Sequence, residues 1–144
     1  MIDQLGLEPH PEGGWYRRTW TAPAPVAAGP ATEPTGAVRA AGSSILYLLA
    51  GGRRSHWHRV DATELWQHCA GDPLELLVGD PSPVTTHRLG RDLMGGEVPQ
   101  VVVGPGAWQS ATVDGAWALA VCVVVPEFRF EHFELAPEGW SPAP

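Results

Sequence analysis

Turn-forming residues recur about every ten residues along most of this chain, a spacing typical of antiparallel sandwiches and barrels, and this constrains the fold most strongly. Turn signals occur at residues 51–52, 60–63, 71–73, 79–83, 89–97, 104–106 and 114–115, most of them clusters of Gly, Pro and Asp. The segments between them are short and rich in Val, Leu and Trp. With 15 prolines and 17 glycines in 144 residues, long helices are unfavourable. The sequence therefore predicts an all-β fold, a closed barrel or a double sheet.

The expected strands are short apolar, β-branched or aromatic runs. They cover residues 15–20, 43–50, 74–78, 84–88, 98–103, 107–113, 117–125 and 128–135, with two more in the histidine-rich segment 54–68. Asp114-Gly115 is a strong hairpin signal between two of these strands. Residues 21–42 are dominated by Pro, Ala, Gly and Thr, so we expect a surface loop there, within a single domain spanning residues 1–144.

The histidine-rich segment holds the densest set of chemically useful side chains. On a regular strand His56 and His58 lie roughly 6.6 Å apart along the chain and point to the same face. Glu64, Trp66 and His68 occupy alternate positions of the next expected strand and so would also point to one face. The short polar link at residues 60–63 between the two strands predicts a hairpin. Two paired strands would then direct these side chains into one cavity. The pattern predicts a ligand or metal site.

Composition excludes several classes of function. All nine basic residues are arginine and the formal net charge is -7, so the scattered arginines do not form the basic face that nucleic acid binding needs. Without lysine the chain has no residue for a Schiff base, a pyridoxal phosphate anchor or a Walker-type phosphate site. No apolar run reaches 18 residues and no signal peptide pattern opens the chain. We expect a cytoplasmic protein without membrane or nucleic acid partners.

Two familiar nucleophile arrangements are also absent. No Gly-x-Ser-x-Gly elbow occurs, which argues against serine-based acyl transfer. Cys69 and Cys122 lack a Cys-x-x-Cys spacing, so we expect buried free thiols. His68 and Cys69 are sequence neighbours on a strand and should point to opposite faces, which disfavours a thiolate nucleophile.

The motifs of this chain resemble those of the cupin superfamily. Gly51, His56-x-His58, Glu64 and Gly71 resemble the first cupin motif, and Pro105-Gly106-Ala107-Trp108-Gln109 resembles the second. More closely, the chain is similar to the small cupins of the cupin_5 or DUF985 family. That similarity is carried by His-Pro-Glu-Gly-Gly at 10–14, Ser55 with His58-Arg59, Glu64-x-Trp66, residues 70–74, residues 99–103 and Trp108-Gln109.

The resemblance implies a double-stranded β-helix, also called a jelly-roll barrel, with a small-molecule pocket inside and usually a homodimer. It implies no single reaction, because the cupin fold hosts isomerases, lyases, dioxygenases and plain binders. Cupin metal sites usually use three histidines and one glutamate, but Gln109 stands at the second-motif histidine. The implied ligand set is His56, His58, Glu64 and Gln109. The amide of Gln109 is a weaker ligand for a transition metal than an imidazole. The resemblance therefore leaves two alternatives: a divalent Fe, Mn, Ni or Zn ion in the site, or a site without metal.

Further residues are candidates for ligand contact. The indole of Trp66 is expected either to form a wall of the pocket or to pack in the core. Gln109 is expected in the pocket, and His68 is expected to line the pocket or to pack deeper in the barrel. Tyr16 and Arg18 share one strand face and would reach the pocket mouth, where a guanidinium suits an anionic group.

Three other residues are expected outside the pocket. For Arg59 we favour an ion pair at the surface or dimer interface, and for Trp108 packing outside the pocket. Glu12, with the glycines after it, is expected to form a lid, a dimer arm or a simple turn.

Three functions are consistent with these residues. The first is an isomerase, epimerase or lyase in which His58 or His56 moves a proton next to a carbonyl group, while Glu64, with or without a metal, stabilises the developing charge. The second is a module that binds a metabolite without chemistry. The third is an Fe(II)-dependent oxygenase, which needs a redox metal.

Overall fold

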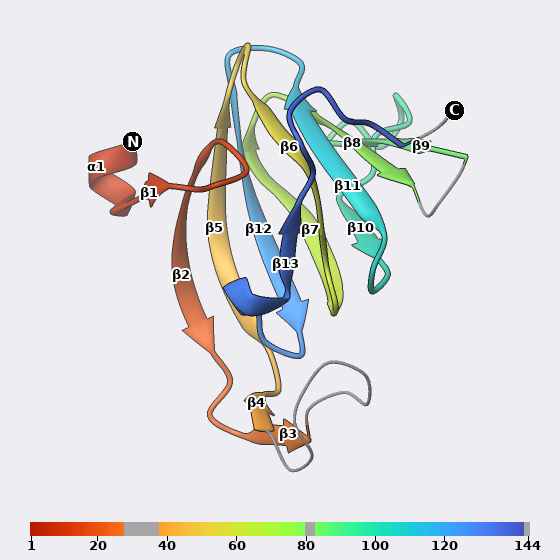
Figure 1. Cartoon of the computed structure of the whole chain (residues 1–144). Helices are drawn as coiled ribbons and strands as arrows, with labels where there is room; N and C mark the ends of the chain where they lie inside the picture. Colours follow the sequence, from red (N-terminus) through yellow and green to blue (C-terminus); the bar gives the residue numbers. More distant parts are fainter. Residues whose placement is uncertain (28–37, 80–82, 143–144) are drawn as a thin grey trace.

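Two antiparallel β-sheets face each other and enclose the interior of the protein (Figure 1). The computed structural model describes residues 1–27, 38–79 and 83–142. Within these residues the first sheet has the order β1 (Glu8–Pro9), β2 (Trp15–Thr21), β5 (Ser43–Ala50), β12 (Trp117–Val125), β7 (Thr63–Gly71) and β10 (Gln100–Val103). The second has the order β13 (Phe133–Leu135), β6 (Arg54–Val60), β11 (Trp108–Val113), β8 (Leu74–Gly79) and β9 (Thr85–Leu89). The all-β prediction is confirmed.

Short elements flank the two sheets. The helix α1 (Ile2–Leu5) lies beside β1 and ends at Gly6, whose φ of 62° is left-handed. A separate antiparallel pair, β3 (Pro25–Ala27) and β4 (Val38–Ala40), lies at the lower end of the view in Figure 1. The 3₁₀ turn η1 (Phe130–His132) leads into β13. No helix in the described segments is long and apolar enough to cross a membrane.

Two expected segments differ from the prediction. Residues 128–135 were expected to form one strand, but residues 128–129 are irregular, the turn η1 occupies Phe130–His132 and the strand β13 forms only at Phe133–Leu135. Alternation of aromatic and polar residues does not distinguish a strand from a 3₁₀ turn over so few residues. The expected surface loop 21–42 contains β3 and β4; residues 28–37 lie outside the described residues.

The expected hairpin between β6 and β7 is wrong, and its correction matters for the site. β6 belongs to the five-stranded sheet and β7 to the six-stranded sheet, so the chain crosses between sheets at residues 61–62. The Asp114-Gly115 turn likewise joins β11 to β12 across the two sheets. A turn motif gives the direction of the chain but not the sheet that the next strand joins. His58 and Glu64 therefore belong to opposing walls.

Small side chains on the inner face of β12 leave room between the sheets. The burial of β12 alternates strictly, and the inward positions are Ala118, Ala120, Cys122 and Val124. Larger residues such as Tyr47, Trp66, Leu74 and Leu76 fill the core around them. Of the inward positions of β12, only Cys122 and Val124 line the cavity, so one end of the barrel is packed and the other retains a cavity.

Candidate active site

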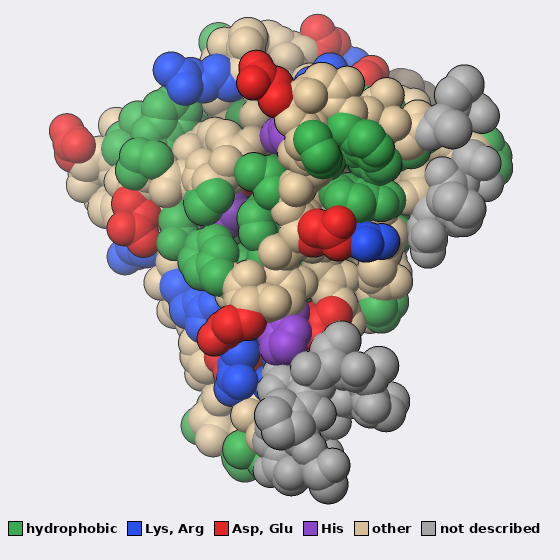
Figure 2. All heavy atoms as spheres, in the orientation of Figure 1, with side chains coloured by type: hydrophobic (Ala, Val, Ile, Leu, Met, Phe, Trp, Pro, Cys, Tyr) green, Lys and Arg blue, Asp and Glu red, His purple; other side chains and the backbone are tan. Residues whose placement is uncertain are grey.

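A cavity of about 190 Å³ opens between the two sheets. Its polar lining consists mainly of Glu8, His10, Glu12, Arg18, His58 and Glu64. Its aromatic lining consists of Tyr16, Tyr47, Trp66, Phe128 and Phe130. Hydrophobic side chains also gather on the face that carries η1 and β13, and histidine is visible between them (Figure 2).

The carboxyl group of Glu12 lies at the centre of the polar lining. Its Oε1 accepts a hydrogen bond from the Ser55 hydroxyl at 2.9 Å. Its Oε2 lies 3.3 Å from both His10 Nδ1 and His58 Nε2. Glu12 is only 7% exposed, and burial raises its pKa to about 8, although hydrogen bonds from Ser55 and Tyr47 act in the opposite direction. The carboxyl group is therefore mainly protonated near neutral pH.

The ring of His58 is held in one tautomer by its own strand. Its Nδ1 lies 2.8 Å from the carbonyl oxygen of His56, which only accepts, so Nδ1 carries the hydrogen. The lone pair of Nε2 then faces Glu12. Burial lowers the pKa of His58, partly offset by the charge of Glu64. A neutral imidazole and a protonated carboxyl group thus share a proton along one 3.3 Å contact.

Glu64 is held from the opposite wall by an amide. The Gln109 Nε2 donates to Glu64 Oε2 at 2.5 Å, and the Trp66 indole N–H donates to Gln109 Oε1 at 2.8 Å. Because β11 and β7 lie in different sheets, this chain of hydrogen bonds ties the two walls together. Burial raises the pKa of Glu64 to about 7, while His58 and Gln109 lower it. Glu64 is therefore close to half ionised near neutral pH.

His10 is surrounded by aromatic rings. Its ring packs edge-to-face on Tyr16 with centroids 4.6 Å apart, and on Tyr47 and Phe133 at 6.1 and 5.8 Å. The Glu12 backbone N–H donates to its Nδ1 at 3.3 Å. Burial, followed by repulsion from His58, lowers the pKa of His10 to about 4, so this imidazole is neutral at physiological pH.

Two glycines allow Glu12 to reach the interior. Gly13 and Gly14 have φ values of 108° and 72°, which side chains other than glycine rarely adopt. A Cβ on Gly13 would overlap the Arg54 carbonyl oxygen. The loop is fixed by the Tyr47 hydroxyl, which donates to the Gly13 carbonyl oxygen at 2.8 Å, and by the His56 N–H, which donates to the Glu12 carbonyl oxygen at 2.7 Å.

Sequence reasoning missed Glu12 and His10 as cavity residues. Glu12 was expected in a lid, dimer arm or simple turn, but its side chain is buried inside the barrel. The available signal was the pair Gly13-Gly14 directly after a carboxylate and ahead of a strand. Two glycines without side chains allow the loop to approach the neighbouring strands closely. The side chain of the residue before them can then be brought into the interior.

A β-bulge overturns the expectation that His56 and His58 point the same way. On β11, Gln109 pairs with His58 but Ala111 pairs with Ser55, so β6 carries one extra residue between these pairs. Ser55 and His58 consequently both face Glu12. His56 turns outward, and its Nε2 lies 3.2 Å from the Pro137 carbonyl oxygen. The residue count between two histidines does not reveal such a bulge.

His68 keeps the alternation of Glu64 and Trp66 but lies farther along β7, outside the cavity lining. Its strand partner is the inward residue Ala120, and the register shift comes only after it, at Cys69, between the pairs Leu119–Ala70 and Ala120–His68. The Nε2 of His68 donates to the Asp72 carbonyl oxygen at 3.0 Å. Cys69 is exposed, contrary to the expectation of two buried thiols, while Cys122 is buried and lines the cavity.

The remaining expected residues divide between the cavity and the outer surface. Trp66, Tyr16 and Arg18 line the cavity. Trp108 packs on Trp140, with centroids 4.4 Å apart, and stays outside as expected. Arg59 forms the expected ion pair, with Glu134 at 2.6 Å.

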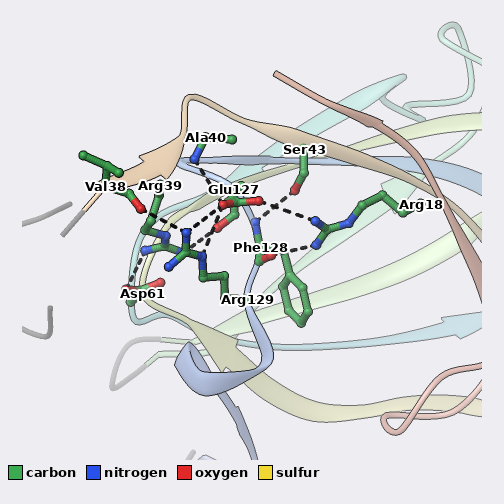
Figure 3. Close-up of polar contacts among 9 residues, drawn as sticks. All are labelled: Arg18, Val38, Arg39, Ala40, Ser43, Asp61, Glu127, Phe128 and Arg129. Atoms are coloured by element: carbon green, nitrogen blue, oxygen red, sulfur yellow. Dashed lines mark hydrogen bonds and ion pairs between the residues drawn. The ribbon is translucent and has the colours of Figure 1, made fainter. Parts of the chain in front are cut away.

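Arg18 is already engaged at the cavity mouth. Its Nη2 donates to the Phe128 carbonyl oxygen at 2.7 Å and its Nη1 lies 3.5 Å from Glu127 Oε2 (Figure 3). Glu127 also accepts from the Ala40 N–H at 3.1 Å and from Arg129 at 3.0 Å. These contacts join β4, β2 and the segment after β12 at the rim of the barrel.

The expected metal ligands do not form a metal site. Among residues 1–27, 38–79 and 83–142, no group of three or more His, Cys, Asp or Glu side chains is placed to hold a metal ion. His56 faces outward, and the Gln109 amide oxygen accepts from Trp66. The donor set therefore does not fit a transition metal.

Comparison with known proteins assigns the chain to a family. The model of the Cupin_5 family, described as cupin superfamily (DUF985), matches residues 1–136. The chain belongs to this family. A search of the curated proteins gave no match.

Solved structures agree with this assignment. A hypothetical protein from Leishmania major is 31% identical with a TM-score of 0.83, over 94% of this cupin and 84% of that chain. A Shewanella oneidensis protein is 37% identical with a TM-score of 0.81, over 94% and 81%. An uncharacterized Klebsiella pneumoniae protein with a double-stranded β-helix domain is 15% identical with a TM-score of 0.59, over 96% of both chains, and supports the fold alone.

Proposed function

We propose that this cupin is a small-molecule enzyme of the isomerase, epimerase or lyase type, acting by proton transfer inside the barrel. The observation that carries the proposal is the 3.3 Å contact between Glu12 Oε2 and His58 Nε2 in a cavity that Glu64 also lines. Two carboxyl groups with different environments supply an acid and a base at the same pH.

Glu64 is the base in this proposal. With a pKa of about 7, a large fraction of it is ionised near neutral pH and accepts a proton from a substrate carbon next to a carbonyl group. The C–H electron pair then moves into the carbonyl group and yields an enolate. The Gln109 amide orients the carboxylate through Oε2. Protonation of the same carbon from the other face gives an epimer, and protonation of the neighbouring carbon gives an isomer. Loss of a β-substituent from the enolate gives an elimination product instead.

The Glu12–His58 pair is the acid. Protonated Glu12, with a pKa of about 8, has a proton to donate to the developing oxyanion. This proton returns to Glu12 when the enol goes back to the carbonyl form, while His58 orients the Glu12 carboxyl group by accepting its hydrogen bond through Nε2, because the Nδ1 hydrogen of His58 is held by the His56 carbonyl oxygen. Positioned acid–base groups typically accelerate such steps about 10²- to 10⁴-fold.

Hydrogen exchange tests the proposal even when the product is unidentified. Small carbonyl compounds are incubated with the protein in D₂O, and loss of the proton signal next to the carbonyl is followed by NMR. We expect at least one compound to exchange, and Glu64→Gln and Glu12→Gln each to slow exchange by about 100-fold or more. The matched control is Glu75→Gln on the outer face of β8, which should exchange like the wild type. Equal rates for all four proteins contradict the proposal.

A binding module without chemistry remains the second candidate. The five aromatic rings of the cavity lining favour it, because such walls suit ligand binding whether or not a reaction follows. Compounds that raise the melting temperature but show no exchange, with the same shift in the Glu12→Gln variant, would favour this candidate over the enzyme.

A further inference from the structure

The cavity contains buried carboxyl groups without a cationic partner. Glu12 and Glu64 are 7% and 6% exposed. All nine arginines lie in the described segments, and none forms an ion pair with either glutamate there. The ion-pair contacts of Glu12 are to His10 and His58, whose burial favours the neutral form. Glu12 keeps its proton near neutral pH, so the ionised fraction of Glu64 is the negative charge buried here, and its hydrogen-bond partner Gln109 is neutral. A carboxylate is rarely buried without a cationic partner, so the chain leaves a place for a positive charge beside Glu64.

An anionic ligand finds no matching group in the same cavity. Arg18 is the one guanidinium of the described lining. It is occupied by the Phe128 carbonyl oxygen at 2.7 Å and by Glu127 at 3.5 Å, and it lies at the rim (Figure 3). Glu8 adds a third carboxyl group to the lining. A carboxylate or phosphate would therefore meet the ionised fraction of Glu64 without a compensating cation.

Aromatic rings complete the environment of a cation. Tyr47 and Trp66 meet edge-to-face with centroids 5.5 Å apart, and Trp66 is fixed by its hydrogen bond to Gln109. Phe128 and Phe130 meet edge-to-face at 4.9 Å nearer the mouth. The faces of such rings attract cations within about 6 Å, most strongly when water is excluded.

We infer that the ligand of this cavity is a small organic cation, whose charge is held between the Glu64 carboxylate and the aromatic lining. Such a cation would be the substrate class of the proposed enzyme, and this part rests on the proposed function. The preference for a positive charge does not, because it is a property of binding alone. The volume of about 190 Å³ limits the charged part to a group of quaternary or primary amine size.

A charge series of nearly equal shape tests the inference. The probes are choline, its neutral carbon analogue 3,3-dimethylbutan-1-ol, and 3,3-dimethylbutanoate, each titrated into the whole protein by calorimetry at neutral pH and constant ionic strength. We expect choline to bind at least tenfold more tightly than the alcohol, and the carboxylate most weakly. Binding of the alcohol or the carboxylate equal to or tighter than choline overturns the inference, as does no binding of choline up to about 10 mM, which is about 100-fold above a typical metabolite affinity.

A pair of variants assigns the preference to one residue. Glu64→Gln should reduce the preference of choline over the alcohol to less than threefold, whereas the matched Glu75→Gln should keep it. The wild-type series decides the inference even if Glu64→Gln does not fold. The two proposals fail separately: choline preference without proton exchange of any carbonyl compound removes the enzyme and keeps the cation site, and exchange without choline preference does the reverse.

Discussion

Replacing Glu12 by glutamine should change how stability depends on pH. The pKa of Glu12 is raised from 4.5 to about 8 in the folded protein, mainly by burial. Between these values the folded state keeps a proton that the unfolded chain has lost, so stability falls as pH rises. A glutamine side chain has about the same shape and does not titrate, so the Glu12→Gln variant lacks this loss.

The magnitude follows from one proton. Each pH unit within the window changes the free energy of unfolding by about 1.4 kcal/mol per proton. From pH 5.5 to 7.5, allowing for partial ionisation near the upper limit, the wild type should lose about 2.5 kcal/mol relative to the Glu12→Gln variant. His10 and His58 have lowered pKa values and act with the opposite sign up to the unfolded value of 6.5, and Glu64, with a raised pKa, acts in the same direction as Glu12. All three are present in both proteins, so the difference between the proteins reports mainly the carboxyl group of Glu12.

Urea unfolding followed by tryptophan fluorescence measures this difference at pH 5.5 and 7.5. Glu75→Gln, on the exposed face of β8, is the control and should track the wild type at both values. If the wild type and Glu12→Gln lose or gain stability in parallel, the carboxyl group of Glu12 titrates normally and the reasoning fails.

Three further substitutions probe the geometry. Gln109→Ala should lower the free energy of unfolding by about 2–4 kcal/mol, because it leaves the Trp66 N–H and Glu64 without their buried partner. A decrease below about 0.5 kcal/mol in urea unfolding would be inconsistent with the two hydrogen bonds. His56→Ala should keep proton exchange within about threefold of the wild type, since the side chain faces outward, and a loss comparable to that of Glu64→Gln would place His56 in the mechanism. Gly13→Ala should shift the loop and lower exchange by about tenfold or more while the sheets remain folded, as measured by exchange rate and circular dichroism; unchanged exchange would show that the loop tolerates a Cβ.

The sequence indicated the strands well because each is a short apolar run between turn residues. Ser43–Ala50 and Trp117–Val125 have the expected boundaries. Sheet membership was not predictable from these signals, since the turns at 61–62 and 114–115 cross between sheets rather than close hairpins. Strand pairing is decided by contacts between distant segments, which local patterns do not contain.

The site was predicted in part for the same reason. His58, Glu64 and Trp66 lie in the cavity because they follow the alternation of their strands. His56 does not, because a β-bulge on β6 breaks that alternation, whereas His68 keeps the alternation but lies farther along β7, outside the cavity lining. Glu12 comes from a loop, where side-chain direction depends on glycine dihedral angles and on the strands that the loop approaches. Those are features of the folded chain rather than of its periodicity.

The central claim is that Glu12 holds its proton beside His58 at neutral pH. Carboxyl-¹³C NMR of glutamate-labelled protein, with the Glu12 signal assigned by its loss in Glu12→Gln, tests it most directly. The signal should titrate with a midpoint near 8. A midpoint near 4.5 would mean an ionised carboxylate throughout the physiological range, and would contradict the account.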